Sequence, residues 1–159
     1  MKIIKTKILT DRQKEDINVL WNSEYPVKLK DRFPILLDGA AWHNHYIIED
    51  LNASVIAWAT DFEKENQVRF SIIVSSSHKG KGLGSALIDR LKAEHNEFYG
   101  WVIDHDDDVK LNGELYKSPM AFYLKHDFEV LNEQRIDSEM IKAVLIRWQE
   151  NTLEKQIRP

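Results

Sequence analysis

Residues 68–91, VRFSIIVSSSHKGKGLGSALIDRL, decide the fold of this 159-residue chain. The apolar run 68–74 predicts a β-strand, and the glycine-rich loop 79–84 (KGKGLG) leads into an amphipathic helix. Glycines at alternate positions let the backbone turn so that free amides at the helix start face outward. These amides, the positive end of the helix dipole and the two lysines of the loop attract phosphate. The stretch therefore predicts a binding site for a phosphate-bearing ligand.

Other phosphate-binding patterns fit this loop less well. The Walker A spacing, four residues between a glycine and Gly-Lys-Ser/Thr, is absent from the sequence. The dinucleotide fingerprint fits Gly80 and Gly82, but its third glycine falls on Ser85. For this segment alone, a tight strand-to-helix turn with solubilising lysines is the plain alternative.

The composition excludes several classes of protein. With 26 acidic and 22 basic residues the chain is mildly acidic, which disfavours bulk binding of nucleic acid. It has no cysteine, so disulfides, thiolate zinc sites and a cysteine nucleophile are excluded. The N-terminal apolar stretch is interrupted by lysines, unlike a signal peptide, and no run is long enough to cross a bilayer. We expect a soluble, intracellular protein of the cytoplasm, with no nucleic-acid or membrane partner.

The pattern of apolar residues and turn signals predicts a single α+β domain over residues 1–150 and a charged tail over 151–159. Strands are expected at 1–9, 42–49, 54–60, 68–74, 98–104, 128–135 and 140–148. Helices are expected at 11–21 with Asp11 as the cap, at 27–37, at 85–95, and from Ser118 onward. The strand–helix–strand order around the glycine loop implies a right-handed crossover between two parallel neighbours.

A second motif lies at residues 118–128, SPMAFYLKHDF. Ser118 as N-cap and Pro119 at the first helical position are a strong start signal for a helix. Tyr123 follows more than one turn later, where its ring projects toward the expected parallel strand pair. Taken alone, a Phe-Tyr pair in an amphipathic helix is usually core packing.

Together the two motifs resemble the GNAT superfamily of N-acetyltransferases. The first family motif, Gln/Arg-x-x-Gly-x-Gly/Ala, is matched by residues 79–84, and the second, Phe-Tyr-x-x-x-Gly-Phe, by residues 122–128 (FYLKHDF). The order of expected elements also matches over nearly the whole chain. The resemblance implies an α+β (α/β) fold: a mixed, mostly antiparallel sheet of six to seven strands with a parallel central pair, flanked by about four helices.

The chain departs from the family pattern at four places. Lys79 stands where Gln or Arg is usual, and Asp127 replaces a glycine, which is tolerable because Asp accepts left-handed backbone angles. An asparagine common near the start of the second-motif helix is missing, and Tyr116 and Ser118 lie in its vicinity. The loop 105–117 is longer than typical.

The resemblance implies acetyl-CoA, or another acyl-CoA, as donor, a small-molecule or peptide amine as acceptor, and no metal. Loop amides would bind the pyrophosphate, and the edge of the strand before the loop would bind the pantetheine amides, with an oxyanion held by an amide near Ile73 or Val74. The residues expected to contact the donor are Ile72, Ile73, Val74, Lys79, Gly80, Lys81, Gly82, Leu83, Gly84, Ser85 and Ser118. Tyr123 would protonate the departing thiolate as general acid. Monomer and homodimer both remain open.

A base is also expected, since a primary amine is mostly protonated at neutral pH. Glu63 and Glu65 at a predicted turn are candidates, as are Asp104 and His105 at the end of a predicted strand. Strand ends beside the parallel pair favour Asp104 and His105, although each is equally well an ordinary solvated residue.

The acidic run 104–108 suggests a metal site only superficially. The EF-hand pattern fails because Val109 occupies its glycine position and Leu115 its terminal glutamate position. A solvated loop that attracts a cationic acceptor, such as a polyamine or a lysine side chain, is the favoured interpretation. His43 and His45 share a strand face, but no third ligand follows them.

Two functions from other classes remain open. One is a non-catalytic, acyl-CoA-binding regulatory module, against which the intact loop and Tyr123 argue. The other is a nucleotide-phosphate binder unrelated to CoA, which the failed Walker and dinucleotide spacings disfavour.

Overall fold

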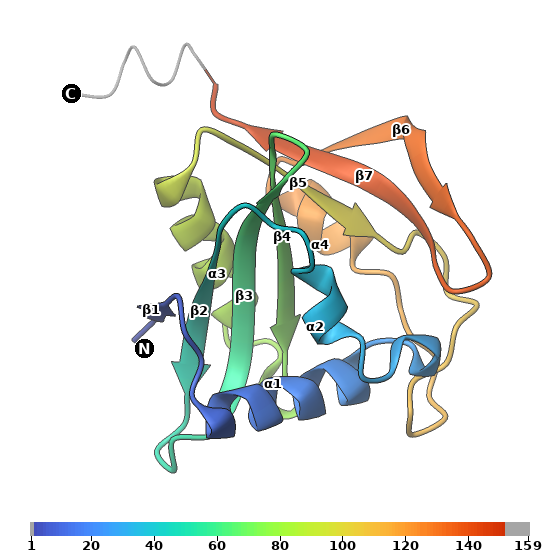
Figure 1. Cartoon of the computed structure of the whole chain (residues 1–159). Coiled ribbons are helices and arrows are strands. Elements are labelled where there is room, and N and C mark those ends of the chain that lie inside the picture. Colours follow the sequence, from blue (N-terminus) through green and yellow to red (C-terminus); the bar gives the residue numbers. More distant parts are fainter. Residues whose placement is uncertain (1, 152–159) are drawn as a thin grey trace.

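A seven-stranded mixed sheet, in the order β1-β2-β3-β4-β5-β7-β6, forms the centre of the computed structural model (Figure 1). The structure describes residues 2–151, so from residue 152 onward the predicted tail 151–159 lies outside it. The strands are β1 (Ile4–Thr6), β2 (His43–Glu49), β3 (Val55–Lys64), β4 (Gln67–Val74), β5 (Glu97–Val102), β6 (Glu129–Asp137) and β7 (Lys142–Gln149). The α-helices are α1 (Asp11–Glu24), α2 (Phe33–Leu36), α3 (Leu83–Glu94) and α4 (Met120–Lys125).

This architecture confirms the predicted fold class. All sheet pairings among the described strands are antiparallel except that of β4 with β5, which α3 connects as the expected crossover. Arg69 and Tyr99 are the single registered pair between these two parallel strands. Beyond this pair β4 and β5 separate toward their carboxyl ends (Figure 1), which leaves the last residues of β4 without a strand partner on that side.

The structure corrects the predicted helix bounds: α3 begins at Leu83 instead of Ser85, and the predicted helix 27–37 is a 3₁₀ turn (Val27–Leu29) followed by the short α2. Two further helix starts differ from the predictions by one residue. Thr10, not Asp11, caps α1: its hydroxyl accepts from the Gln13 amide at 3.1 Å, and the Gln13 side chain accepts from the Thr10 amide at 2.9 Å. This reciprocal capping box satisfies two amides at once, which a lone Asp at position 11 does not do. α4 begins at Met120, one residue after the expected Pro119, and the Ser118 hydroxyl accepts from the Met120 amide at 3.3 Å.

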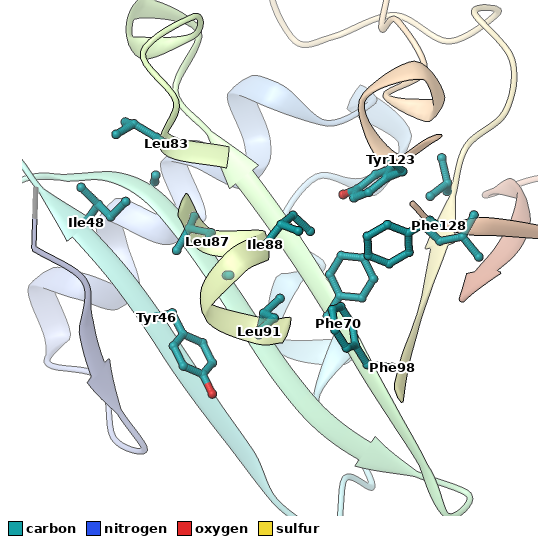
Figure 2. Packing of buried hydrophobic residues seen from close by; sticks show 14 of the residues in the cluster. Tyr46, Ile48, Phe70, Leu83, Leu87, Ile88, Leu91, Phe98, Tyr123 and Phe128 are labelled. Atoms are coloured by element: carbon teal, nitrogen blue, oxygen red, sulfur yellow. The ribbon is translucent and has the colours of Figure 1, made fainter. Parts of the chain in front are cut away.

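Hydrophobic cores lie on both faces of the sheet. α1 covers one face with Ile17, Leu20 and Trp21, the residues that its helical periodicity places together. α3 and α4 cover the other face, where Leu87, Ile88 and Leu91 of α3 are fully buried (Figure 2). The residues that point toward α1 and those that point toward α3 alternate along β4, so this strand presents a different set of side chains to each layer.

The aromatic ring of Phe70 fills the space beside the separating strands. Its centroid lies 5.2 Å from that of Phe98, 5.5 Å from Phe128 and 5.7 Å from Tyr123 (Figure 2). The ring reaches this position because residue 100 of β5 is glycine: a Cβ there would lie 2.5 Å from Phe70 Cε1. Gly100 therefore fixes how closely the side chains of β4 approach the backbone of β5.

Two turns have the backbone angles that their residues predict. Glu65 and Asn66, with φ of 53° and 61°, form the two-residue connection between β3 and β4, which is typical of a type I′ hairpin. Asp127, where the family motif has glycine, has φ of 68° and so accepts the left-handed angle expected for that position. Its conformation lets the chain turn sharply from α4 into β6.

A buried carboxylate stabilises the far end of the sheet, where β3 ends. Asp61 accepts hydrogen bonds from Tyr46 at 2.7 Å and Asn44 at 3.1 Å, and it lies 2.6 Å from His95 Nε2. Burial acts to raise the pKa of Asp61, but the hydrogen bonds from His95, Tyr46 and Asn44 outweigh it and lower the pKa. The group is therefore a satisfied structural anion that ties β2 and β3 to the end of α3.

None of the helices in residues 2–151 combines the length and hydropathy required to cross a membrane.

We expect Gly100→Ala to destabilise the protein by about 1–3 kcal/mol, because the new methyl group overlaps the Phe70 ring. Thermal and chemical denaturation followed by circular dichroism measure this loss. In a Phe70→Leu background the ring atoms are gone, so Gly100→Ala should cost less than half as much there. An equal cost in both backgrounds would contradict the proposed contact.

Candidate active site

A cavity of about 780 Å³ lies where β4 and β5 separate. Its walls come from the loop 78–82 with the start of α3, from α4, from the segment between the end of α1 and α2, and from β5 and the β6–β7 hairpin. The carboxyl half of β4 also lines it. The strand separation thus creates one space that joins the predicted phosphate site to Tyr123.

The glycine loop has the geometry of an anion site. Gly80 and Gly82 have φ of 80° and 78°, angles that residues with a Cβ adopt at a cost. Gly82 is the N-cap of α3, and no side chain caps the amides that follow it. The first-turn amides of a twelve-residue helix therefore have no intrahelical partner and stand at its positive end. Gly84 differs, because it lies inside the helix and makes room for the Phe122 ring.

Glu24, the last residue of α1, holds the loop in place. Its carboxylate accepts from the Ser76 amide at 3.0 Å and from the Ser76 hydroxyl at 2.5 Å. The same carboxylate lies 3.8 Å from Lys79 Nζ and 3.5 Å from Lys110 Nζ, and its side chain is only 10% exposed. Glu24 thus connects α1, the glycine loop 79–84 (the predicted phosphate loop) and the long loop 105–117.

Tyr123 lies in the cavity wall on α4 and packs against the adjacent rings of Phe70 and Phe128 (Figure 2). Its side chain is buried. Burial raises the pKa of Tyr123 above its ordinary value, and the neighbouring Tyr25 raises it further. The phenol is therefore a proton or hydrogen-bond donor across the whole physiological pH range.

Tyr25 and Ser71, which also line the cavity, form a hydroxyl pair that sequence analysis did not single out. Their oxygens lie 2.9 Å apart, with either residue as donor. Burial raises the pKa of Tyr25, while its bond to Ser71 acts in the other direction. Ser71 interrupts an apolar strand two residues after Arg69, and residues two apart on a strand face the same side. The sequence therefore indicated that Ser71 and Arg69 share a face. Tyr25 follows the end of a helix, and no sequence pattern indicated its position.

The structure brings most of the predicted donor-site residues together. Those that line the cavity are Ile72, Ile73, Val74, Lys79, Gly80, Gly82, Leu83, Gly84, Ser85 and Tyr123. Lys81 and Ser118 are adjacent in sequence to lining residues but do not line the cavity themselves.

The predicted base residues lie elsewhere. Asp104 forms a bidentate pair with Arg135, with N–O distances of 2.8 and 3.0 Å, and this hydrogen bonding lowers the pKa of the carboxyl group. Glu63 accepts from Trp42 Nε1 at 2.5 Å, and His105 Nδ1 accepts from the Asp107 amide at 3.1 Å. None of the three lines the cavity, so the structure does not bring them to Tyr123.

The two histidines of β2, His43 and His45, make contacts within the protein that stabilise the fold. The rings of His43 and His45 lie 5.3 Å apart, and His45 Nδ1 accepts from Trp58 Nε1 at 3.0 Å. Burial lowers the pKa of His45 to about 4, which keeps the ring neutral. Within residues 2–151, no group of three or more His, Asp or Glu side chains is arranged to hold a metal ion.

Comparison with known families gives one match. A family model described as an acetyltransferase (GNAT) domain matches residues 41–130, which include the phosphate loop and Tyr123. A search of curated protein sequences gives no match.

Solved structures share the fold at low sequence identity. The aminoglycoside 6′-N-acetyltransferase from Enterococcus faecium superposes with a TM-score of 0.67 at 12% identity, covering 94% of this chain and 97% of that one. A phosphinothricin acetyltransferase from Sinorhizobium meliloti in complex with acetyl-CoA gives 0.59 at 15% identity, covering 95% and 90%. A mutant spermidine N-acetyltransferase from Vibrio cholerae gives 0.59 at 16% identity, covering 99% and 100%.

We expect Gly82→Ala to weaken CoA binding about fivefold or more, because the left-handed angle of residue 82 orients the first amides of α3. Isothermal titration calorimetry with CoA measures the effect.

The matched control for this change is Gly39→Ala, at a glycine with φ of 76° that does not line the cavity. In both positions an added Cβ meets nothing within 4 Å, so both variants should lose about 1 kcal/mol of stability through the backbone alone. A loss of CoA affinity of the same size in both variants would contradict a specific role for the loop.

Proposed function

The chain belongs to the GNAT acetyltransferase family, and from that premise we propose that it transfers an acetyl group from acetyl-CoA to an amine by direct attack. One observation carries the proposal: a single cavity is lined by the uncapped start of α3, by the unpaired edge of β4 and by Tyr123. These are the parts needed to bind a phosphate, to align an extended amide-bearing chain and to assist a leaving thiolate.

The residues present fit the donor. The amides at the start of α3 and the charge of Lys79 suit a pyrophosphate, with Lys81 adding charge from the surface of the same loop. The carboxyl half of β4 has no registered partner toward β5, so its peptide groups are available to pair with the amides of pantetheine. Ser118 contributes indirectly, since its hydroxyl holds the first amide of α4.

The chemistry follows from these positions. A neutral amine attacks the thioester carbonyl, and the carbonyl oxygen becomes an oxyanion that a backbone amide near Ile73 or Val74 stabilises. When the tetrahedral intermediate collapses, the carbon–sulfur bond breaks and the amine nitrogen releases one proton to solvent. Tyr123 donates to the departing sulfur and regains its proton from solvent, so that one amide and one thiol are formed.

The pKa values of the phenol and of the leaving thiol determine how Tyr123 assists the reaction. An ordinary phenol has a pKa of about 10 and an ordinary thiol about 8.5, so full proton transfer is uphill. Burial raises the pKa of Tyr123 and makes the transfer harder still. Its principal contribution is therefore a hydrogen bond that stabilises the thiolate as it forms, with the proton reaching sulfur late in the step.

The acceptor amine must be neutral before it attacks. Glu24 is the one carboxylate among the described residues that line the cavity, and two lysines and Ser76 already engage it. Asp104, His105 and Glu63 stay predictions for a base that acts through water. We propose that the acceptor reacts from the fraction that is already neutral in solution.

This proposal predicts the pH profile. Because only the neutral amine reacts, kcat/KM should rise with pH up to the pKa of the acceptor amine. Because burial raises the pKa of Tyr123, its proton is retained above the ordinary value, and no descending limb should appear below about pH 10. Initial rates of thiol release, corrected for spontaneous thioester hydrolysis, give the profile. A descending limb near pH 8–9 that disappears in Tyr123→Phe would contradict this role.

Tyr123→Phe removes the hydroxyl and keeps the ring that packs on Phe70. We expect kcat to fall about 10- to 100-fold, at the lower end for a general acid because a thiolate leaves readily, with the Kd for acetyl-CoA within twofold. Thiol release with a panel of amines, together with calorimetry, separates the two effects.

Tyr99→Phe is the matched control for this change. It deletes a hydroxyl on β5 that bonds to Glu97 at 2.8 Å and does not line the cavity, so its kcat should stay at the wild-type value. Wild-type turnover in Tyr123→Phe would remove this residue from the mechanism. Tight CoA binding without thiol release from any amine would instead favour a non-catalytic, CoA-binding regulatory module.

A further inference from the structure

The half of the cavity around α2 and the β6–β7 hairpin has an apolar wall. It is formed by Trp21 of α1, the segment that follows α1 through α2, β5, and the β6–β7 hairpin. The apolar side chains that line it are Trp21, Leu29, Ile35, Leu36, Trp101 and Ile141. A wall of this kind accommodates an apolar or aromatic body better than a flexible polycation.

The charges in this half of the cavity are positive. Arg32 and Arg69 line it, whereas the one lining carboxylate among residues 2–151, Glu24, lies at the phosphate loop beside Lys79 and Lys110. A polyamine would meet two guanidinium groups here and no free carboxylate.

Arg69 is the more informative of the two arginines. It lies on β4 two residues before Ser71, so both side chains share the face toward α1 and α2. Its side chain is only 18% exposed, yet its closest bond is to the neutral Gln67 oxygen at 3.0 Å. Its one carboxylate contact is with Glu65, which is 86% exposed and 3.5 Å away. A guanidinium buried to this extent is ordinarily paired with an anion.

The remaining donors of Arg69 are accessible: none of its N–H groups is both buried and without a partner, and the side chain lines the cavity. A guanidinium carries five N–H donors in a planar fork, and the bonds to Gln67 and Glu65 leave the others without an acceptor in the part of the chain that the structure describes. The fork matches a carboxylate in shape and charge. Arg32, next to α2, lines the same space, and its side chain has no hydrogen bond or ion pair within residues 2–151.

Three of the four carboxylates of the acidic loop 104–108 are engaged within the protein. Asp104 is bound by Arg135, Asp108 lies 3.0 Å from Lys28, and Asp106 accepts from the Ser118 amide at 2.7 Å, whereas Asp107 is exposed to solvent and lies outside the cavity. None of these carboxylates lines the cavity. The expectation that this loop attracts a polyamine acceptor therefore has no support from its contacts.

We propose that the acceptor is a small amine that also carries a carboxylate and an apolar or aromatic body, with the carboxylate held by Arg69 and assisted by Arg32. This inference rests on the proposed function, because the acceptor reacts by acetyl transfer. The preference for a carboxylate rests on the two arginines alone. The carboxylate would pair with the Arg69 fork, the apolar body would lie against Trp101 and Leu29, and the amine would face the thioester.

Matched amines test the proposal. Phenylalanine, leucine and tryptophan would be compared with their carboxamides and with spermidine, with kcat/KM expressed per neutral amine to remove differences in amine pKa. At least one carboxylate should exceed its carboxamide by tenfold or more. Carboxamides or spermidine that equal or exceed every carboxylate would overturn the proposal.

Substitutions of the two arginines test whether they cause the preference for a carboxylate over its carboxamide. Arg69→Gln should raise KM for the preferred carboxylate about tenfold or more, while leaving KM for its carboxamide and for acetyl-CoA within twofold. Arg69→Lys keeps the charge without the fork and should recover part of the loss. Arg32→Gln, at an exposed residue, should give a smaller effect and keeps the test valid if Arg69→Gln is poorly folded. Arg12→Gln is the matched control, because Arg12 bonds to Asn52 and Ser54 outside the cavity.

Equilibrium binding separates this inference from the proposed reaction. Calorimetry on the protein saturated with CoA would compare each carboxylate with its carboxamide, in wild type and in Arg69→Gln. A carboxylate preference that depends on Arg69, without turnover, would uphold the inference and refute acetyl transfer. Equal affinities, or no binding of any carboxylate in the panel, would refute the inference even if another amine is acetylated.

Discussion

The separation of β4 from β5 is the constraint on which the rest of this structure depends. It begins after the Arg69–Tyr99 pair, and the Phe70 ring, lying against Gly100, occupies the space on the helix side. The gap exposes peptide groups of β4 that a closed sheet would have paired, and it opens the cavity that Tyr123 reaches from α4. Without the separation, the uncapped amides at the start of α3 would still be present, but no cavity would connect them to Tyr123.

Sequence patterns predicted the elements that depend on local interactions. Alternating residues, helix periodicity and the positive φ angles of Gly80, Gly82 and Asp127 all follow from a few neighbouring positions. Tyr123 lies on the predicted helix because a start signal precedes it by a few residues, although this helix begins one residue later than expected. The start of α1 was misplaced by one position, since Thr10 and Asp11 are both good caps and the partner side chain of Gln13 decides between them.

The acceptor half of the cavity and the surroundings of the predicted bases depend on contacts between distant segments. Asp104 at a strand end looked available, yet Arg135 on β6 occupies both of its oxygens, and no pattern near Asp104 announces that pairing. Ser71 and Tyr25 meet across 46 residues of chain. The positive charge of Arg69 and Arg32 is likewise brought to one cavity only when α2 and β4 come together in the fold. The sequence alone therefore led us to predict an acceptor site at the acidic loop 104–108 instead.

Glu24 gives the phosphate loop a property that its glycines alone would not provide. By binding Ser76, Lys79 and Lys110, it orders the loop while the chain folds, so little conformational freedom is left to lose when a ligand arrives. In the proposed donor complex, Lys79 would exchange a protein carboxylate for a phosphate oxygen instead of gaining an ionic contact from water. The affinity for the donor would then depend on the difference between two competing ion pairs, one of which is supplied by α1, outside the loop itself.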